Sequence, residues 1–135
     1  MCKQGFRRHA SFVLLILILL GAAGCGDPWG TAQGTVILDG QPLKKGVVTF
    51  HPVVEGSTAY ATLSESGTFI AMTGAKPGLP PGEYQITVID QTIPTPGTNE
   101  IAKLLTPEKY ASTKTSDLKV TITRGSNRVD LVMKK

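Results

Sequence analysis

The sequence is poor in the residue types that most often build catalytic, metal or disulfide sites. Its 135 residues include two cysteines, two histidines and one tryptophan, and aromatic residues make up only 6%. Cys2 and His9 lie within the first 24 residues, so residues 25–135 contain one cysteine, Cys25, and one histidine, His51. A histidine-based metal cluster is therefore excluded, and a Ser-His-Asp arrangement would depend wholly on His51.

Long apolar runs and strong charge are also scarce. Charged residues make up 18% and hydrophobic residues 41%, a balance typical of a chain that buries a core. The length suits one domain and excludes most multi-domain enzymes. The 15 glycines and 9 prolines predict frequent turns.

The first 24 residues are predicted to be an export signal. Lys3, Arg7 and Arg8 form a positive segment, residues 12–20 an apolar run, and residues 21–24 a stretch of small side chains. The apolar run has nine residues, fewer than the roughly 20 that a membrane span needs. An uncleaved signal anchor is the alternative.

The end of this signal resembles the bacterial lipobox, in which small residues precede a cysteine that receives a diacylglycerol thioether and then an N-acyl group. The matching residues are Ala22-Ala23-Gly24-Cys25, although Ala22 stands where the family usually has leucine. We therefore expect cleavage between Gly24 and Cys25 and acylation of Cys25, with palmitate as a typical chain. Ordinary signal peptidase cleavage, leaving Cys25 as a free thiol, is the alternative.

Loss of the signal changes the charge and the location expected for the mature chain. Removing Lys3, Arg7 and Arg8 leaves 11 Lys+Arg against 10 Asp+Glu, so the net charge falls from +4 to +1 and nucleic acid is not an expected partner. Cys2 is removed as well, which excludes a structural disulfide. Gly26, not aspartate, follows Cys25. In similar Gram-negative lipoproteins, an aspartate at this position often retains the protein at the inner membrane. Its absence here favours the outer membrane.

Beyond Trp29 the chain shows short segments with a two-residue apolar period, bounded by turn residues. This pattern is typical of an all-β chain folded as an antiparallel β-sandwich. A turn is predicted over residues 124–127, and a helical turn over 100–105 inside a long connection from Asp90 to Ser116. The seven expected strands are residues 33–38, 47–51, 58–63, 68–72, 84–88, 118–123 and 129–133.

The turn and core residues also resemble a known family, the carboxypeptidase regulatory-like, transthyretin-like sandwich, over about residues 33–133. A later segment, Thr106-Pro107-Glu108-Lys109-Tyr110, is similar to small bacterial lipoproteins that carry this domain. The resemblance implies an immunoglobulin- or prealbumin-like sandwich and an extracytoplasmic, non-catalytic module, often accessory to enzymes or envelope complexes. Its motifs are Gly34-x-Val36-x-x-Asp39-Gly40-x-Pro42-Leu43-x-x-Gly46-x-Val48-x-Phe50-x-Pro52, Gly67-x-Phe69 and Pro81-Gly82-x-Tyr84-x-Ile86-x-Val88.

Two features are candidates for binding. Tyr60, on the outward face of its strand, and Tyr110, in the long connection, are predicted to offer an aromatic platform to sugar rings. Singly exposed tyrosines without a role are the alternative. Residues 90–116 are a candidate protein-contact segment, or a loop packed over an open end of the sheet. His51 is expected to be a solvated residue facing away from Phe50.

The sequence thus predicts a signal peptide over residues 1–24, a lipidated cysteine and tether over 25–32, and a sandwich domain over 33–135. The function expected is that of a lipid-anchored structural or protein-interaction module of the cell envelope, with no enzymatic activity and no cofactor. A carbohydrate-binding module is the alternative, and an enzyme centred on His51 the least favoured. The expected partners are membrane lipid through Cys25, and envelope proteins or glycans.

Overall fold

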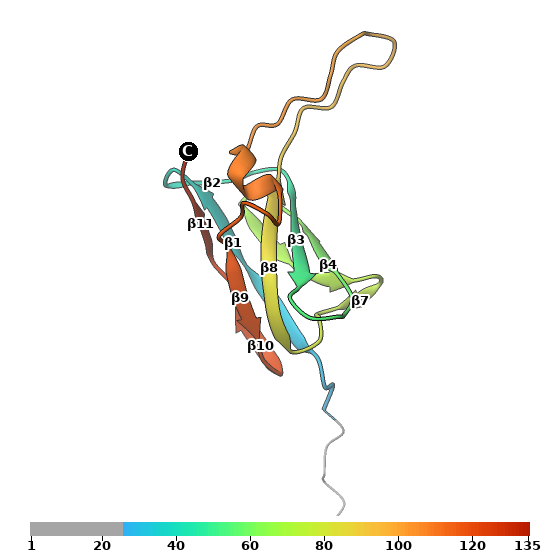
Figure 1. The fold of residues 1–135 in the computed structure, drawn as a ribbon, viewed down its shortest axis with the longest axis vertical. Coiled ribbons are helices and arrows are strands. Elements are labelled where there is room, and N and C mark those ends of the chain that lie inside the picture. Colours follow the sequence, from blue (N-terminus) through green and yellow to red (C-terminus); the bar gives the residue numbers. More distant parts are fainter. Residues whose placement is uncertain (1–25) are drawn as a thin grey trace, which may run out of the picture.

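A computed structural model describes residues 26–135, so the predicted signal, its cleavage site and Cys25 lie outside the described residues. The described chain is nearly all β, with its strands in two sheets and one short 3-10 helix (Figure 1). Its elements are β1 (Gly30–Leu38), β2 (Gln41–Pro42), β3 (Val47–Pro52), β4 (Ala59–Thr62), β5 (Thr68–Ile70), β6 (Met72–Thr73), β7 (Lys76–Pro77), β8 (Gly82–Ile89), η1 (Glu108–Ala111), β9 (Lys119–Ile122), β10 (Gly125–Arg128) and β11 (Leu131–Met133).

The first sheet is built around β1, which pairs along both edges. One edge carries β10 along the first half of β1 and β11 along the second half, both parallel to it. The other edge carries β5 and β2, both antiparallel. Between β10 and β11 the chain packs closely against β1 at Gly34, where the Val129 amide donates to the Gln33 carbonyl at 2.9 Å.

The second sheet has the order β7-β6-β4-β3-β8-β9, and every neighbouring pair in it is antiparallel. β3 and β8 form its centre and pair over six residues, from Val47 opposite Ile89 to Pro52 opposite Tyr84. Tyr84 also donates its hydroxyl to the Pro80 carbonyl at 2.7 Å, which fixes the corner before β8.

The core lies between the two sheets. Phe50 of β3 is in contact with Phe69 of β5 in the other sheet, with ring centroids 6.0 Å apart, and with Tyr84 at 6.3 Å. The inward faces predicted from the two-residue period are confirmed. The buried apolar residues are Ala32, Val36, Val48, Phe50, Ala59, Ala61, Leu63, Phe69, Ala71, Leu79, Tyr84, Ile86, Val88, Tyr110, Ile122, Val129, Leu131 and Met133.

Several local expectations are corrected. Residues 125–128 form β10 and not a turn, and the parallel pairing of β1 with β10 and β11 departs from a purely antiparallel sandwich. Residues 100–105 form no helical turn, while η1 lies further on. β1 begins at Gly30, earlier than the predicted Gln33, so residues 30–32 belong to the sheet and not to the tether.

The connection between β8 and β9 has two parts of different character. Residues 90–105, called the arm below, run out and back as a narrow loop that projects from the sandwich (Figure 1). The Leu105 amide donates to the Asp90 carbonyl at 2.8 Å and the Thr92 amide to the Lys103 carbonyl at 2.9 Å. Residues 106–116 instead pack back on the sheet, where Thr106 and Ser116 are buried.

Candidate functional site

Tyr60 lies where the sequence predicts, on the outward face of the second sheet. β4 alternates between buried Ala59 and Ala61 and exposed Tyr60 and Thr62, because every second side chain of a strand points to the same side. The Tyr60 side chain is 55% exposed. Its ring is therefore available to a ligand.

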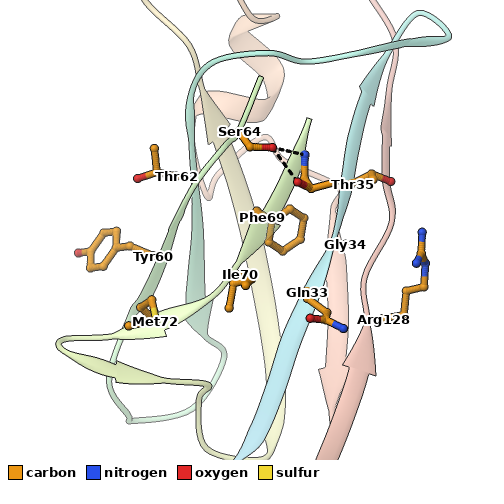
Figure 2. A pocket seen from close by; sticks show the side chains of 11 residues that line it. Gln33, Gly34, Thr35, Tyr60, Thr62, Ser64, Phe69, Ile70, Met72 and Arg128 are labelled. Atoms are coloured by element: carbon orange, nitrogen blue, oxygen red, sulfur yellow. Dashed lines mark hydrogen bonds between the residues drawn. The ribbon is translucent and has the colours of Figure 1, made fainter. Parts of the chain in front are cut away.

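An open groove begins beside Tyr60. It forms because β4 stays in the second sheet while β5, the next strand, joins the first sheet beside β1. The groove has a volume of about 720 Å³ (Figure 2). Its apolar part consists of Phe69, Ile70 and Met72, and its polar part of Gln33, Thr35, Thr62, Ser64, Thr68 and Arg128.

Four of the polar residues of the groove make side-chain hydrogen bonds: Thr35, Ser64, Thr68 and Arg128. Ser64 Oγ lies 2.7 Å from Thr68 Oγ1, and Thr35 Oγ1 donates to Asp130 at 2.9 Å. Arg128 Nε donates to the same carboxylate at 2.9 Å. Arg128 and then Thr35 stabilise the charged carboxylate, which lowers the pKa of Asp130. Arg128 thus lies beside Asp130 at the side of the groove formed by the first sheet.

The lining of the groove offers groups that can bind a ligand. Its lining offers hydroxyls, one amide, one phenol and one guanidinium, and contains no aspartate, glutamate, histidine, cysteine or lysine. Hydroxyl and amide groups both donate and accept hydrogen bonds, and an aromatic ring with a polar tip suits an amphipathic ligand. Sequence reasoning identified Tyr60 but missed Thr35, Ile70 and Arg128. A two-residue period predicts which face of its own strand a residue occupies. It does not predict which other strands line the same groove.

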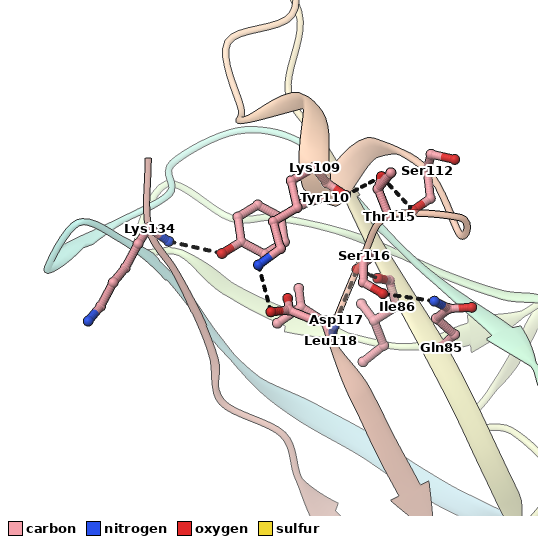
Figure 3. Close-up of polar contacts among 10 residues, drawn as sticks. All are labelled: Gln85, Ile86, Lys109, Tyr110, Ser112, Thr115, Ser116, Asp117, Leu118 and Lys134. Carbon is pink, nitrogen blue, oxygen red and sulfur yellow. Dashed lines mark hydrogen bonds and ion pairs between the residues drawn. The ribbon is translucent and has the colours of Figure 1, made fainter.

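Tyr110 is not part of this groove, and its predicted exposure is wrong. It lies in η1 with its side chain buried in the core, only 5% exposed. Its hydroxyl accepts a hydrogen bond from the Lys134 amide at 3.2 Å (Figure 3). Lys109 lies beside the ring, 5.3 Å from its centroid, and pairs with Asp117 at 2.6 Å. Tyr110 fastens the long connection and the C-terminal strand together.

The segment after η1 covers the outer face of the second sheet. Gln85 donates to the Thr113 carbonyl at 2.6 Å and to the Ser116 carbonyl at 2.8 Å, and Ser116 Oγ donates to the Ile86 carbonyl (Figure 3). Residues 112–116 of this connection therefore pack against β8, whereas one of the two alternatives from the sequence was a loop packed over an open end of the sheet.

His51 faces away from Phe50, as predicted, but it is half-buried and not fully solvated. Its Nε2 lies 3.0 Å from Thr87 Oγ1 of the neighbouring strand, and Thr87 itself is buried. Burial disfavours the charged imidazolium and lowers the pKa of His51. Neither His51 nor Thr87 lines the groove.

The arm carries a second exposed feature. Ile93 and Ile101 lie on its outgoing and returning limbs, with 92% and 87% of their side chains exposed. At the tip, the Thr98 hydroxyl donates to the Thr95 carbonyl at 2.8 Å, and the Thr95 amide donates to Glu100 at 3.1 Å. These bonds shape the tip while leaving both isoleucines in solvent.

Among residues 26–135, no group of three or more histidine, cysteine, aspartate or glutamate side chains is arranged to hold a metal ion. In the same range the structure has no helix that is both long enough and apolar enough to cross a membrane.

Comparison with known proteins gives no family. Neither a protein-family profile nor a curated protein matches the chain. Among solved structures, the chain is similar to part of a 9R-lipoxygenase from Cyanothece PCC8801, with a TM-score of 0.43 and 13% sequence identity. That match covers 80% of this chain and 16% of the lipoxygenase chain.

Proposed function

We propose that the chain is a lipid-anchored, non-catalytic module of the cell envelope that binds a protein partner through its arm. The observation that carries this proposal is the position of the arm, which projects from the end of the sandwich opposite to the N-terminal segment (Figure 1). The strand register agrees. Gly30 at the start of β1 pairs with Leu79, just before β8 begins, whereas the arm starts where β8 ends.

The arm is built to present apolar side chains at a distance from the core. Pro94 and Pro96 lack amide donors, so the outgoing limb cannot form a continuous ladder with the returning one. The described arm pairs only near its base, through residues 90–92 and 103–105. Isoleucines exposed on such an extension gain free energy when a partner buries them, at about 25 cal/mol per Å². We favour a groove on a partner protein as the binding site for the arm, because the arm points away from the expected lipid anchor.

Site-specific photocrosslinking in native envelopes tests the arm. A photoreactive residue in place of Ile101 should give a discrete protein adduct, and Ile93→Asp in the same chain should remove that adduct. Val132, which is 58% exposed on β11, is the matched control position. The same adduct pattern from both positions would contradict a binding role of the arm.

Acylation of Cys25 is tested separately. Growth with a clickable fatty acid should label the wild-type chain and leave Cys25→Ser unlabelled. Label that is absent from both chains would contradict the anchor, whatever the crosslinking shows.

Carbohydrate binding is the second candidate, and the groove beside Tyr60 favours it. A tyrosine ring bordered by hydroxyl, amide and guanidinium groups suits a sugar, whose ring faces are apolar and whose edges are hydroxylated. Tyr110 takes no direct part, since it is buried. On a glycan array, Tyr60→Ala should abolish saturable binding while Tyr110→Phe keeps it. Equal binding by wild type and Tyr60→Ala would contradict this role.

The finer fold type belongs to the same proposal: a transthyretin-like sandwich of the carboxypeptidase regulatory-like kind, on a lipoprotein of the outer membrane. Residues of the resemblance occupy positions that the backbone demands. Gly67 turns with a φ of 79°, Gly34 lies against the Val129 backbone, and Tyr84 fixes the corner before β8. Fold likeness of this kind does not itself assign a function, so the proposed binding role rests on the arm and the groove.

A further inference from the structure

The segment before β1 contacts the sandwich through Asp27 and Trp29. Asp27 pairs with Lys76 of β7 at 3.1 Å, and the Trp29 amide donates to Asp27 at 3.0 Å. Lys76 Nζ also lies 3.8 Å from the centroid of the Trp29 ring, a cation–π contact. The segment is therefore held against the β6–β7 hairpin from Asp27 onward.

Little chain remains between this point and the predicted acylation site. Extended chain spans at most about 3.6 Å per residue, so the two residues from Cys25 to Asp27 reach about 7 Å. The headgroup layer on each side of a bilayer is about 5 to 8 Å thick. An acylated Cys25 therefore holds the end of the sandwich that carries Asp27 and Lys76 against the lipid headgroups.

The same end of the sandwich, called the base below, exposes apolar side chains. It comprises the start of β1, the β6–β7 hairpin, the loop of residues 53–56 after β3 and the turn of residues 123–124. The Val53 amide donates to the Glu83 carbonyl at 3.0 Å, which places the loop beside the start of β8. Val53 and Val54 are 57% and 74% exposed, and no core residue covers them.

Charges at the base are mixed. Lys76 and Arg124 stand against three acidic residues of the same end, Asp27, Glu55 and Glu83, which leaves these five with a net charge of −1. A surface of this kind has little net attraction for anionic lipid, so apolar contact and the short tether must carry the association. Tryptophan is itself enriched at the membrane–water interface, because its ring is apolar and its indole N–H is polar.

We propose that the base is a lipid-contacting surface that sets the orientation of the module, with Trp29, Val53 and Val54 in the headgroup layer and the arm pointing outward. This inference rests on the proposed acylation of Cys25. It adds that the tether is short and fastened, so the sandwich sits on the bilayer and does not move freely above it.

Fluorescence of the single tryptophan tests this orientation directly, since Trp29 is the one tryptophan of the sequence. The acylated full-length lipoprotein is placed in phosphatidylcholine vesicles that carry a doxyl quencher either near the headgroup or deep in the acyl chains. Trp29 should be quenched more by the shallow quencher than by the deep one. Adding anionic lipid should leave the quenching unchanged.

Two variants sharpen the test. Val53→Asp combined with Val54→Asp places charges on the base and should reduce the quenching of Trp29. Ile93→Asp, a matched apolar-to-acid change on the arm, should leave it unchanged. An insertion of twelve Gly/Ser residues between Gly26 and Asp27 should also reduce it, because the base is then no longer held near the lipid.

Flotation with the vesicles separates the two proposals. Protein that floats but shows no quenching of Trp29 overturns the lipid-contacting base while leaving the anchor intact. Protein that neither floats nor takes up acyl label overturns both.

Discussion

Tyr60 and Tyr110 have the same side-chain chemistry and opposite environments. Tyr60 borders a solvent-filled groove, and Tyr110 is buried with its hydroxyl on the Lys134 amide. The two-residue strand pattern predicts the exposed position of Tyr60, since alternate residues of a strand share a face. The burial of Tyr110 depends on where residues 106–116 pack, and no local pattern in that connection predicts it.

Removal of one hydroxyl should distinguish these two environments. Tyr110→Phe keeps the buried ring but loses the acceptor of the Lys134 amide, so unfolding should require about 1 kcal/mol less free energy. Tyr60→Phe is the control and should leave stability unchanged, because its hydroxyl is exposed. Urea unfolding of both variants measures the difference, and equal stabilities would show that the Tyr110 hydroxyl contributes nothing.

His51 should make stability depend on pH. Burial lowers its pKa in the folded state from the ordinary 6.5. As the pH falls, the unfolded chain therefore binds a proton at His51 before the folded chain does. The contribution is fully present above pH 6.5 and is lost as the pH falls through that value toward the lower, folded pKa.

Chemical unfolding at about pH 7.5 and about pH 5.5 checks this dependence. The wild type should lose stability between the two values, and His51→Gln should lose less. A wild-type loss that His51→Gln fails to reduce would assign the dependence to other groups.

At the scale of elements, β1 is the strand that the whole first sheet requires. It pairs with β10, β11, β5 and β2, and the chain between β10 and β11 packs closely against it at Gly34. A Cβ at Gly34 would lie 1.8 Å from the Val129 carbonyl oxygen. The sequence showed this glycine as part of a family motif, but only the close approach of the Val129 backbone explains why it must be glycine.

Gly34→Ala should therefore destabilise the first sheet strongly. The added methyl group meets the Val129 backbone, which cannot rotate away as a side chain can, so a loss of about 3 kcal/mol is expected. Gly56→Ala is the matched control, since its new Cβ would lie 3.4 Å from Pro52, an ordinary contact. Thermal unfolding of the two variants tests this, and similar melting temperatures would contradict the close packing of Val129 on Gly34.

At the scale of the whole molecule, Phe50 joins the two sheets into one cooperative unit. Its ring is fully buried and contacts Phe69 of the first sheet and Tyr84 of the second. The arm and the base lie at the two ends of this unit, so any orientation imposed on the base is transmitted to the arm by a rigid core (Figure 1).

Phe50→Ala should cost about 3 to 5 kcal/mol, through lost burial and the cavity left between the sheets. Typical domains have only about 5 to 15 kcal/mol in total, so this variant should be close to unfolding at room temperature. Val132→Ala, on the exposed face of β11, should change stability by less than about 0.5 kcal/mol. Circular dichroism during urea unfolding tests both, and a Phe50→Ala chain as stable as Val132→Ala would contradict the shared core.

The sequence by itself determined the all-β character, most strand positions and the inward face of each strand. The reason is that a two-residue period is a local property, and burying one face leaves little freedom of register. Only the tertiary structure decided the parallel pairing of β10 and β11 with β1, the burial of Tyr110, the groove beside Tyr60 and the contact of Trp29 with Lys76. Each of these joins segments far apart in the chain, and their packing follows from the shape of the assembled sheets and not from any neighbouring residues.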